Sequence, residues 1–257
     1  MRMAFPPAAD HDADTPTCTW SRPPERLQLQ HDAIDLWLVD LDGAPAHEGE
    51  RLLDASERER ASGFRRAIDA RRFVLGRAAL RRVLALYVGA DAAALPLAVG
   101  AHGKPLLAGG PAFNLSHSGE RALCAVSGRA TVGIDLERMR PMPNAPELAK
   151  RFFSPTEAAV IAAANGMRSD ALFFRCWTRK EAVLKALGEG LLRDPASVDA
   201  GFGATERVVE LAGAPRLGVR SFTPEDGWDG AIAVAVEAHE PMPRLRCFDA
   251  GLLDADG

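Results

Sequence analysis

A short acidic segment, Val132-Gly-Ile-Asp-Leu-Glu137, is the first place where this chain could carry chemistry. In a strand, successive side chains point to opposite faces, so the three apolar residues share one face while Asp135 and Glu137 share the other, beside Gly133. Two carboxylates this close repel each other unless a cation binds both or one is protonated. A hard divalent ion such as Mg²⁺, held by carboxylate oxygens and ligand phosphates, would relieve the repulsion. The segment alone leaves open a solvent-facing strand with two acids.

A second acid and a lysine lie in the sequence Trp177-Thr-Arg-Lys-Glu-Ala-Val-Leu-Lys185. Glu181 and Lys185 are four residues apart, so on a helix they share a face, with the glutamate on the favourable N-terminal side. Two structural interpretations remain open at this point. Thr178 and Glu181 have the spacing of a helix capping box, and Glu181 with Lys185 could form an ordinary surface ion pair.

Two further segments have the composition of phosphate-binding loops. Phe113-Asn-Leu-Ser-His-Ser-Gly119 follows an apolar entry with a turn-prone stretch that offers hydroxyls, an imidazole and backbone N–H groups. Gly103-Lys104-Pro105, ten residues upstream, places a lysine beside a rigid turn. Such loops bind phosphates, and they also simply turn the chain.

The basic residues are distributed unevenly. The net charge is −4, yet the segment from Arg51 to Arg82 holds ten arginines against four acids, which makes it +6 and the rest of the chain −10. A solvated helix face is one interpretation, and a surface that binds a small polyphosphate is the other. A chain otherwise this acidic is a poor candidate for nucleic-acid binding. The few lysines suggest places where a compact ammonium is needed: Lys104, Lys150, Lys180 and Lys185.

Length and composition exclude several classes of protein. The chain has 257 residues, of which 47% are apolar and 26% charged, the balance of a globular protein with a substantial core. The sequence holds neither an apolar run of membrane-spanning length nor the apolar core of a secretory signal. Four widely spaced cysteines, without a C-x-x-C pair, favour a cytoplasmic location over a disulfide framework or a zinc site. P-loop, G-x-G-x-x-G and G-x-S-x-G motifs are absent from the sequence.

The pattern of apolar residues predicts a mixed α+β fold that divides near residue 130. We expect a loose arm over residues 1–30, one half over 31–129 and another over 130–257. The first half should begin with a buried strand from Ile34 to Leu41 and continue with helices after a capping sequence at Asp54. The second should contain strands and a helix from Phe173 to Leu187, preceded by a capping box at Ser154-Pro-Thr-Glu157 in which Glu157 is structural.

Taken together and in order, these segments resemble the 4′-phosphopantetheinyl transferases of the Sfp type. The resemblance covers roughly residues 34 to 240 and depends on five motifs in series: GKP (103–105), FNLSHSG (113–119), VGIDLER (132–138), RFFSPTE (151–157) and FFRCWTRKEAVLKALGEGL (173–191). It implies a pseudo-dimeric α+β fold, two similar halves with the active site between them. It also implies transfer of the phosphopantetheine arm of coenzyme A to a serine of a carrier protein, with release of 3′,5′-ADP.

The resemblance also implies roles for individual residues. By position, Asp135, Glu137 and Glu181 look like Mg²⁺ ligands, Glu181 also like the base for the carrier serine, and Lys185 like the partner of the leaving group. The positions where this family contacts coenzyme A are Arg60, Lys104, Pro105, Asn114, Ser116 and His117. Glu57 departs from the pattern, because some members have a lysine there, close to the 3′-phosphate.

The implied partners are acyl, peptidyl or aryl carrier proteins of fatty-acid, polyketide or nonribosomal peptide synthesis. We expect the enzyme to be a monomer and to bind neither nucleic acid nor a membrane. We expect Phe152 and Phe153 either to form part of the docking surface or to belong to the core. Two alternatives remain. A Mg²⁺-dependent hydrolase of coenzyme A or nucleotides would use the same acids with water as the nucleophile, and a non-catalytic module would bind coenzyme A without turnover, although the full set of acids argues against it.

Overall fold

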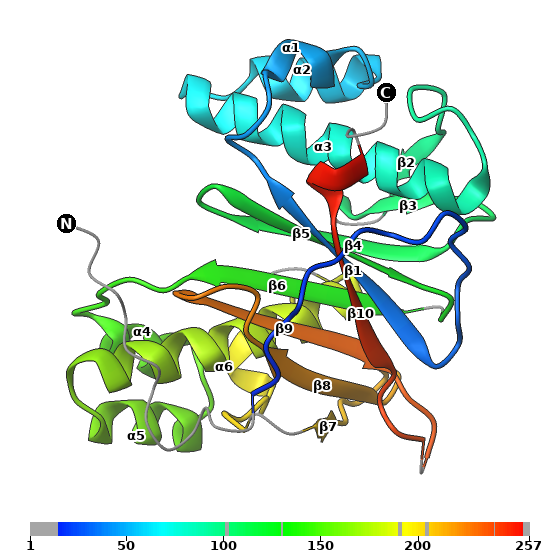
Figure 1. The fold of residues 1–257 in the computed structure, drawn as a ribbon. Coiled ribbons are helices and arrows are strands. Elements are labelled where there is room, and N and C mark those ends of the chain that lie inside the picture. The colour runs from blue at the N-terminus through cyan, green and yellow to red at the C-terminus, as the bar shows by residue number, and fades with distance from the viewer. Residues whose placement is uncertain are drawn as a thin grey trace. The chain divides into compact units, whose positions relative to one another are not determined.

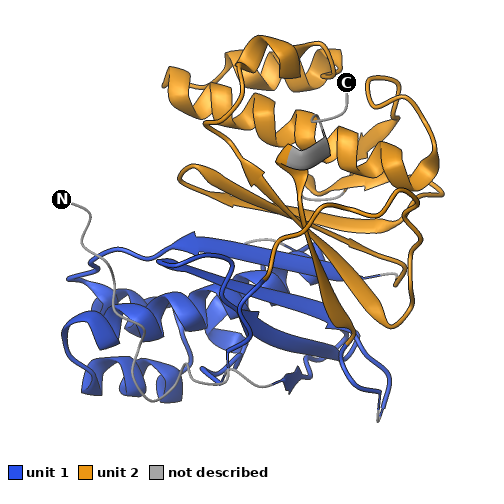
Figure 2. Ribbon diagram, in the orientation of Figure 1, with its two compact units in different colours: residues 1–18, 131–242 blue, residues 19–130, 243–257 orange. Residues whose placement is uncertain are grey.

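The computed structural model describes residues 15–100, 103–129, 131–189, 192–203, 206–238 and 240–253. The chain forms two compact units (Figure 2). Unit 1 comprises residues 1–18 and 131–242, and unit 2 comprises residues 19–130 and 243–257. The chain therefore changes unit between Ala130 and Thr131, and again near each end, which a linear division into 31–129 and 130–257 does not anticipate.

Unit 2 is built on a four-stranded sheet in the order β10-β1-β5-β4 (Figure 1). β1 is parallel to β10 and antiparallel to β5, and a small hairpin of β2 and β3 stands apart. The elements in chain order are β1 (Ala33–Asp40), α1 (Ala46–Glu50), α2 (Ala55–Ser62), α3 (Ala67–Val88), β2 (Leu97–Val99), β3 (Pro105–Leu107), β4 (Ala112–Ser118), β5 (Arg121–Ser127), β10 (Arg244–Asp249) and the short 3₁₀ turn η4 (Ala250–Leu253).

The core of unit 2 lies between its sheet and α3. The apolar run of β1 is buried on both faces, and Trp37, Leu80 and Leu84 are fully enclosed in the same cluster. The expected capping box is present at the start of α2, where the Asp54 side chain accepts from the backbone N–H of Glu57 and the Glu57 side chain accepts from that of Asp54. The early strand and the capped helix are thus confirmed.

Unit 1 is built on an antiparallel sheet in the order β6-β9-β8-β7, with α6 packed across β6, β8 and β9. Residues from the strands and from the C-terminal part of α6 form one of its cores. The elements are β6 (Val132–Arg138), α4 (Ala145–Phe152), α5 (Pro155–Ala163), α6 (Gly166–Leu187), the 3₁₀ turn η3 (Pro195–Ser197), β7 (Arg207–Val209), β8 (Leu217–Phe222) and β9 (Trp228–Ala235).

The helix that carries Glu181 begins earlier than the sequence indicates. α6 starts at Gly166, so Thr178 lies in the middle of the helix and is not a cap. The Thr178 hydroxyl instead donates to the Asp229 carboxylate of β9 at 2.7 Å. The capping-box interpretation of Thr178 and Glu181 is therefore wrong, whereas the box at Ser154 and Glu157 is confirmed at the start of α5.

The segment expected to be a loose arm is held by backbone hydrogen bonds where the structure describes it. Cys18 N–H donates to the Thr223 carbonyl of unit 1 at 2.9 Å, and Ser21 N–H donates to the Cys247 carbonyl of unit 2 at 3.1 Å. Residues 15–30 are thus fixed at these two points, and residues 1–14 lie outside the described part of the chain. The arm prediction is corrected over this described stretch.

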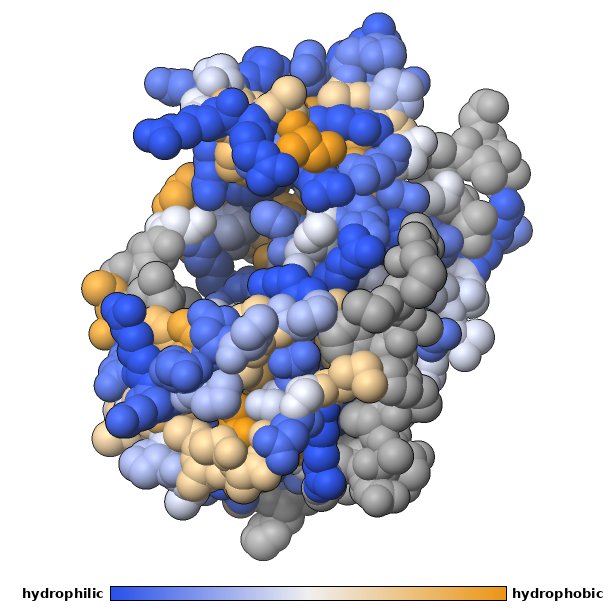
Figure 3. Space-filling model, turned by 90° about the vertical axis from the view of Figure 1, so that its left-hand side faces the viewer, coloured by the Kyte–Doolittle hydropathy of each residue, from blue (hydrophilic) through white to orange (hydrophobic). Residues whose placement is uncertain are grey.

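In the described part of the chain, no helix combines the length and the apolar character needed to cross a membrane. Figure 3 shows a mainly hydrophilic face on which apolar side chains gather in separate groups. The large apolar side chains that are exposed include Val160 of α5 and Met167 of α6.

Candidate active site

The acidic strand and the helix that follows it meet at a glycine. A Cβ atom on Gly133 would lie 2.2 Å from the Ala182 carbonyl oxygen and 2.2 Å from the Ala186 nitrogen, both on the backbone of α6. No side chain fits in that space, so only glycine lets the helix lie this close to β6. The space beside the strand acids is therefore filled by α6, which brings Glu181 and Lys185 to the face of the strand that holds Asp135.

Lys185 pairs with the strand rather than standing on the surface. Its Nζ lies 2.5 Å from Oδ1 of Asp135, whose side chain is 6% exposed, while that of Lys185 is 28% exposed. The alternative of a solvent-facing strand is wrong, because Asp135 is buried and Glu137 is half-buried. The ammonium stabilises one member of a group of carboxylates that would otherwise repel each other.

Glu181 has the electrostatic environment of a general base. Burial raises the pKa of its carboxyl group, and the charge of Asp135 raises it further. The charge of Lys185 lowers this pKa and that of Glu137 raises it, and the resulting pKa of Glu181 lies above its ordinary value. A carboxylate with a raised pKa accepts a proton more readily than an exposed one. The four residues singled out from the sequence thus interact electrostatically in one place.

The same carboxylates have the chemistry of a site for a hard cation. Asp135, Glu137 and Glu181 offer only oxygen donors, the kind that Mg²⁺ prefers. Across the described ranges, no three acidic, histidine or cysteine side chains already lie in an arrangement that could hold a metal ion. Burial is the largest cause of the raised pKa of Glu181, and the negative charges of Asp135 and Glu137, which a cation would offset, add to it. The donor set therefore fits the ion in its chemistry.

An apolar pocket of about 190 Å³ adjoins this acidic group and shares Glu137 with it. Arg140 lies at the same end, 3.5 Å from the Glu137 carboxylate. The remaining lining is apolar and mostly aromatic: Met142, Leu148, Phe152, Phe173, Phe174 and Trp177. The only sign of this pocket in the sequence is the helical spacing of the aromatic residues 173, 174 and 177, which is typical of a shared helix face.

The two phenylalanines that follow Arg151 have different environments. Phe153 is 2% exposed and stacks on Phe173 with ring centroids 5.2 Å apart, so it belongs to the core. Phe152 is half-buried and packs edge-on against Trp177 at the pocket. The docking interpretation is therefore wrong for Phe153.

The residues expected to contact coenzyme A lie in unit 2 and differ in exposure. Arg60 is exposed on α2, with its guanidinium 5.2 Å from the centre of the Phe73 ring. Lys104 is half-buried beside Pro105 at the start of β3, and burial lowers the pKa of its ammonium group. These two cations therefore differ in solvation, which affects how strongly each would attract a phosphate.

The segment FNLSHSG is a strand rather than a loop. Residues 112–118 form β4, paired with β5 from Ala112–Ser127 to Ser118–Arg121. Asn114 and Ser116 are buried at 6% and 4% exposure, and His117 is exposed. The apolar residues that flank the polar ones, together with a tight turn at Gly119 (φ 52°), explain why the stretch continues the sheet. The loop interpretation is corrected.

Several arginines of the basic segment are used inside unit 2. Arg81 is fully buried, with Nε 2.7 Å from Glu57 and a terminal nitrogen 2.7 Å from Asp54. Arg77 lies 3.6 Å from the other oxygen of Glu57. Glu57 is thus a structural residue that binds two arginines. The arginines that remain exposed in this segment are Arg51, Arg58, Arg60, Arg65 and Arg66.

Comparison with known families finds a match over the segment that carries the acidic group. A family model described as the 4′-phosphopantetheinyl transferase superfamily matches residues 131–222, which include β6, α4, α5 and α6. The match therefore spans Asp135, Glu137, Glu181 and Lys185.

Curated relatives extend the similarity over most of the chain. The chain is 36% identical over 231 residues to the 4′-phosphopantetheinyl transferase HetI of Nostoc sp. PCC 7120, covering 87% of this chain and 96% of that protein. It is 33% identical over 149 residues to the 4′-phosphopantetheinyl transferase Sfp of Bacillus subtilis strain 168, covering 56% of this chain and 65% of that protein. A solved holo-[acyl-carrier-protein] synthase of Thermotoga maritima matches with 21% identity and a TM-score of 0.28, over 40% of this chain and 61% of that one.

Proposed function

This chain belongs to the 4′-phosphopantetheinyl transferase superfamily, and we propose that it transfers the 4′-phosphopantetheine arm of coenzyme A to a serine of a carrier protein. The serine oxygen forms a bond to the phosphorus that bears the pantetheine arm, and the pyrophosphate P–O bond breaks. The products are the phosphopantetheinyl carrier protein and 3′,5′-ADP, and the serine proton passes to a base.

The observation that carries this proposal is the acidic group on β6 and α6. Glu181 is held near Asp135 and Glu137 with a raised pKa, and Lys185 reaches into the same group. A phosphoryl transfer needs a positioned base, negative charges that bind a cation, and a positive charge beside the leaving phosphate. These residues supply each of the three.

We assign the base to Glu181. A carboxylate whose pKa is raised towards the working pH takes a proton from an attacking hydroxyl more effectively than an ordinary one. Burial is the largest cause of that raised pKa, and the charges of Asp135 and Glu137 add to it because they disfavour a third negative charge. Glu181 accepts the serine proton as the new O–P bond forms.

We assign charge neutralisation at the leaving phosphate to Lys185. It lies one helical turn after Glu181 and is partly exposed, so its flexible stem can carry the ammonium from Asp135 to a ligand phosphate. An ammonium beside the released phosphate stabilises the charge that develops when the pyrophosphate bond breaks.

Asp135, Glu137 and Glu181 would hold Mg²⁺ through carboxylate oxygens. A bound Mg²⁺ would act as a Lewis acid on the phosphate oxygens of coenzyme A. The Lys185 ammonium stabilises Asp135 through their ion pair.

We propose roles in coenzyme A binding for six residues of unit 2: Arg60, Lys104, Pro105, Asn114, Ser116 and His117. Arg60 offers an exposed guanidinium to a phosphate. Asn114 and Ser116 are buried in β4. We therefore propose that they shape the site rather than offer a mobile amide or hydroxyl group to the ligand. The pocket beside Glu137 suits the apolar part of the pantetheine arm.

The proposed partners are acyl, peptidyl or aryl carrier proteins. We further propose that the two units are similar halves of a pseudo-dimeric fold. Each has a four-stranded sheet and one helix of 22 residues, α3 in unit 2 and α6 in unit 1.

The test is incubation of the full chain with coenzyme A, Mg²⁺ and a panel of apo carrier proteins, followed by mass measurement of each carrier. We expect a mass increase of one phosphopantetheine on at least one carrier, with 3′,5′-ADP in equal amount. Cleavage of coenzyme A without any modified carrier would instead indicate a hydrolase. Binding of coenzyme A without turnover would indicate a non-catalytic module.

A further inference from the structure

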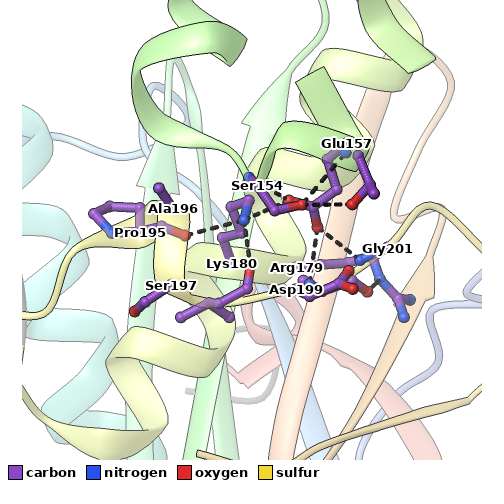
Figure 4. A network of polar contacts seen from close by, with 12 residues as sticks. Ser154, Glu157, Arg179, Lys180, Pro195, Ala196, Ser197, Asp199 and Gly201 are labelled. Atoms are coloured by element: carbon purple, nitrogen blue, oxygen red, sulfur yellow. Dashed lines mark hydrogen bonds and ion pairs between the residues drawn. The ribbon is translucent and has the colours of Figure 1, made fainter. Parts of the chain in front are cut away.

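A buried ion pair lies one residue before Glu181 on α6. Lys180 is 1% exposed, and its ammonium lies 2.7 Å from Oε2 of Glu157 on α5. It also donates to the Pro195 carbonyl at 3.0 Å and to the Val198 carbonyl (Figure 4). All three N–H bonds of the ammonium therefore have acceptors, and these come from two segments outside α6.

Glu157 joins the same segments from the opposite side. Its Oε1 accepts from the backbone N–H groups of Ala200 and Gly201 at 2.9 Å each, and its Oε2 accepts from that of Ser154 at 3.0 Å. The carboxylate thus links the start of α5 to residues 195–201 and to Lys180. These contacts form a closed polar cluster around one point of α6 (Figure 4).

The residue before Lys180 is bound to the same stretch of chain. Nε of Arg179 donates to the Ala200 carbonyl at 2.8 Å, and its Nη1 donates to the Gly203 carbonyl at 2.9 Å. Each residue of a helix is rotated by about 100° from the one before it, since 3.6 residues complete a turn. Two consecutive anchored side chains therefore set the direction in which the next one, Glu181, points.

Stability alone does not explain this pair. Removing two charges from water costs several kcal/mol per ion, and apolar residues of similar volume often stabilise a core as well or better. What the ion pair adds is direction, because its hydrogen bonds are satisfied at only one rotation of the helix. The desolvation cost of this ion pair is consistent with a function that depends on the orientation of α6.

We propose that Glu157 and Lys180 are positioning residues that fix the rotation of α6 and so aim Glu181 at Asp135 and Glu137. The inference rests on the proposed function, since it assigns Glu181 to the reacting group. It extends that function to a pair of buried side chains, one of which is rotated by about 100° from Glu181 on the same helix.

The experiment compares three variants of the full chain: Glu157→Gln, Lys180→Met and the double variant. Asp199→Asn is the matched control, because it breaks an exposed ion pair with Arg207 on the same segment and leaves α6 untouched. Transfer to a carrier is measured at a temperature where each variant is folded. Mn²⁺ is titrated by calorimetry into the coenzyme A-bound protein as a readout independent of turnover.

For the folded variants we expect kcat to fall on the order of 10²-fold while the KM for coenzyme A is unchanged. The affinity for Mn²⁺ should fall about tenfold or more, as expected when the support of a metal ligand is lost. Asp199→Asn should match the wild type in both measurements. Where a single variant does not fold, the double variant, which leaves no unpaired buried charge, decides the question.

Three results would overturn the proposal: normal Mn²⁺ affinity with normal kcat, a parallel loss of coenzyme A binding, or failure of all three variants to fold. The last would make the pair a stability element only. A wild-type chain that modifies no carrier would contradict the proposed function itself. That outcome is separate, because the Mn²⁺ titration still reports on the orientation of Glu181.

Discussion

Two clusters of buried charge, one in each unit, contrast in how their charges are balanced. In unit 2, Asp54 and Glu57 face Arg77 and Arg81, and each carboxylate has a guanidinium within 2.7 Å. In unit 1, Lys185 pairs with Asp135 and acts on Glu181, and Arg140 pairs with Glu137 in a more exposed position, so that two cations face three carboxylates. The first cluster is neutral, whereas the second carries excess negative charge.

The pKa values of the acids follow this difference. Burial tends to raise the pKa of Asp54, but hydrogen bonds from Glu57 and Ser56 and the charge of Arg81 lower it below its ordinary value. The pKa of Glu181 is raised by burial and by Asp135, and Lys185 offsets only part of the increase. Removing one partner from a neutral cluster of this kind destabilises the fold, while a cluster with excess charge is available for a ligand or a proton.

The strongest test of this difference between the two clusters is to remove one negative charge from the acidic group of unit 1. Glu181→Gln should lower kcat for carrier modification by about 10²- to 10⁴-fold, the range of general acid–base effects. The free energy of unfolding should be unchanged or larger, because one of three neighbouring negative charges is gone. Mass measurement of the carrier and urea unfolding give the two values.

A variant of Glu181 with near-normal transfer would remove the base assignment. A large loss of stability together with activity would mean that Glu181 is a structural residue, like Glu57.

The converse test disturbs the neutral cluster. Arg81→Met leaves the buried Glu57 and the partly exposed Asp54 with less compensation, and we expect a loss of about 3–5 kcal/mol in the free energy of unfolding. Arg65→Met, an exposed arginine of the same segment, should stay within about 0.5 kcal/mol. Equal effects of the two changes in urea unfolding would show that the buried cluster is not what stabilises α2 and α3.

The role of Lys185 can be tested by replacing its ammonium with another cation. Lys185→Arg keeps the charge but replaces a compact ammonium, 2.5 Å from Asp135, with a wider guanidinium that does not readily release a proton. We expect coenzyme A binding to persist and transfer to slow on the order of 10²-fold. If Lys185→Arg keeps near-normal kcat across pH while Lys185→Ala does not, charge alone is the role of this residue.

Two glycines test whether close approach of the helix assembles the acidic group. Gly133→Ala forces a methyl group into the backbone of α6, and we expect a loss of about 1–3 kcal/mol in stability, as for other overpacked sites, with a fall in kcat. Gly76 of α3 is the matched control, since a Cβ there would meet nothing nearer than 3.7 Å. Gly76→Ala should instead stabilise unit 2 by about 0.5–1 kcal/mol. Thermal unfolding and transfer rates check both.

Local signals in the sequence predicted much of the fold. The apolar run of β1, the two capping boxes and the strand of the acidic motif depend on neighbouring residues, and the structure confirms them. The parallel pairing of β10 with β1 could not be found this way, because it joins residues about 200 positions apart. For the same reason the sequence did not show that the chain returns to unit 2 at its end.

The candidate site was predictable in its residue types and less so in its pairing. Alternation placed Asp135 and Glu137 on one face, and helical spacing placed Glu181 with Lys185. That Lys185 would bond to Asp135 depends on the contact of α6 with Gly133, which is a tertiary feature. The internal use of Arg77 and Arg81 was equally hidden, because a run of arginines has the same appearance whether its members are buried or solvated.

The smallest expected effect is on the pH dependence of the free energy of unfolding. The neutral cluster of unit 2 and the acidic group of unit 1 should change it in opposite directions. The pKa of Asp54 is lowered in the folded state, so its stabilisation is present above its ordinary value of 3.8 and is lost as the pH falls through the folded pKa. The pKa of Glu181 is raised above its ordinary value of 4.5, so the folded state binds a proton first and gains stability as the pH falls. The two contributions oppose each other in acid. Glu181→Gln removes the gain, so its free energy of unfolding should fall more steeply between pH 7 and pH 4 than that of the wild type, measured by urea unfolding with EDTA present. An equal or shallower fall in Glu181→Gln would mean that the acids of unit 1 are as well balanced as those of unit 2.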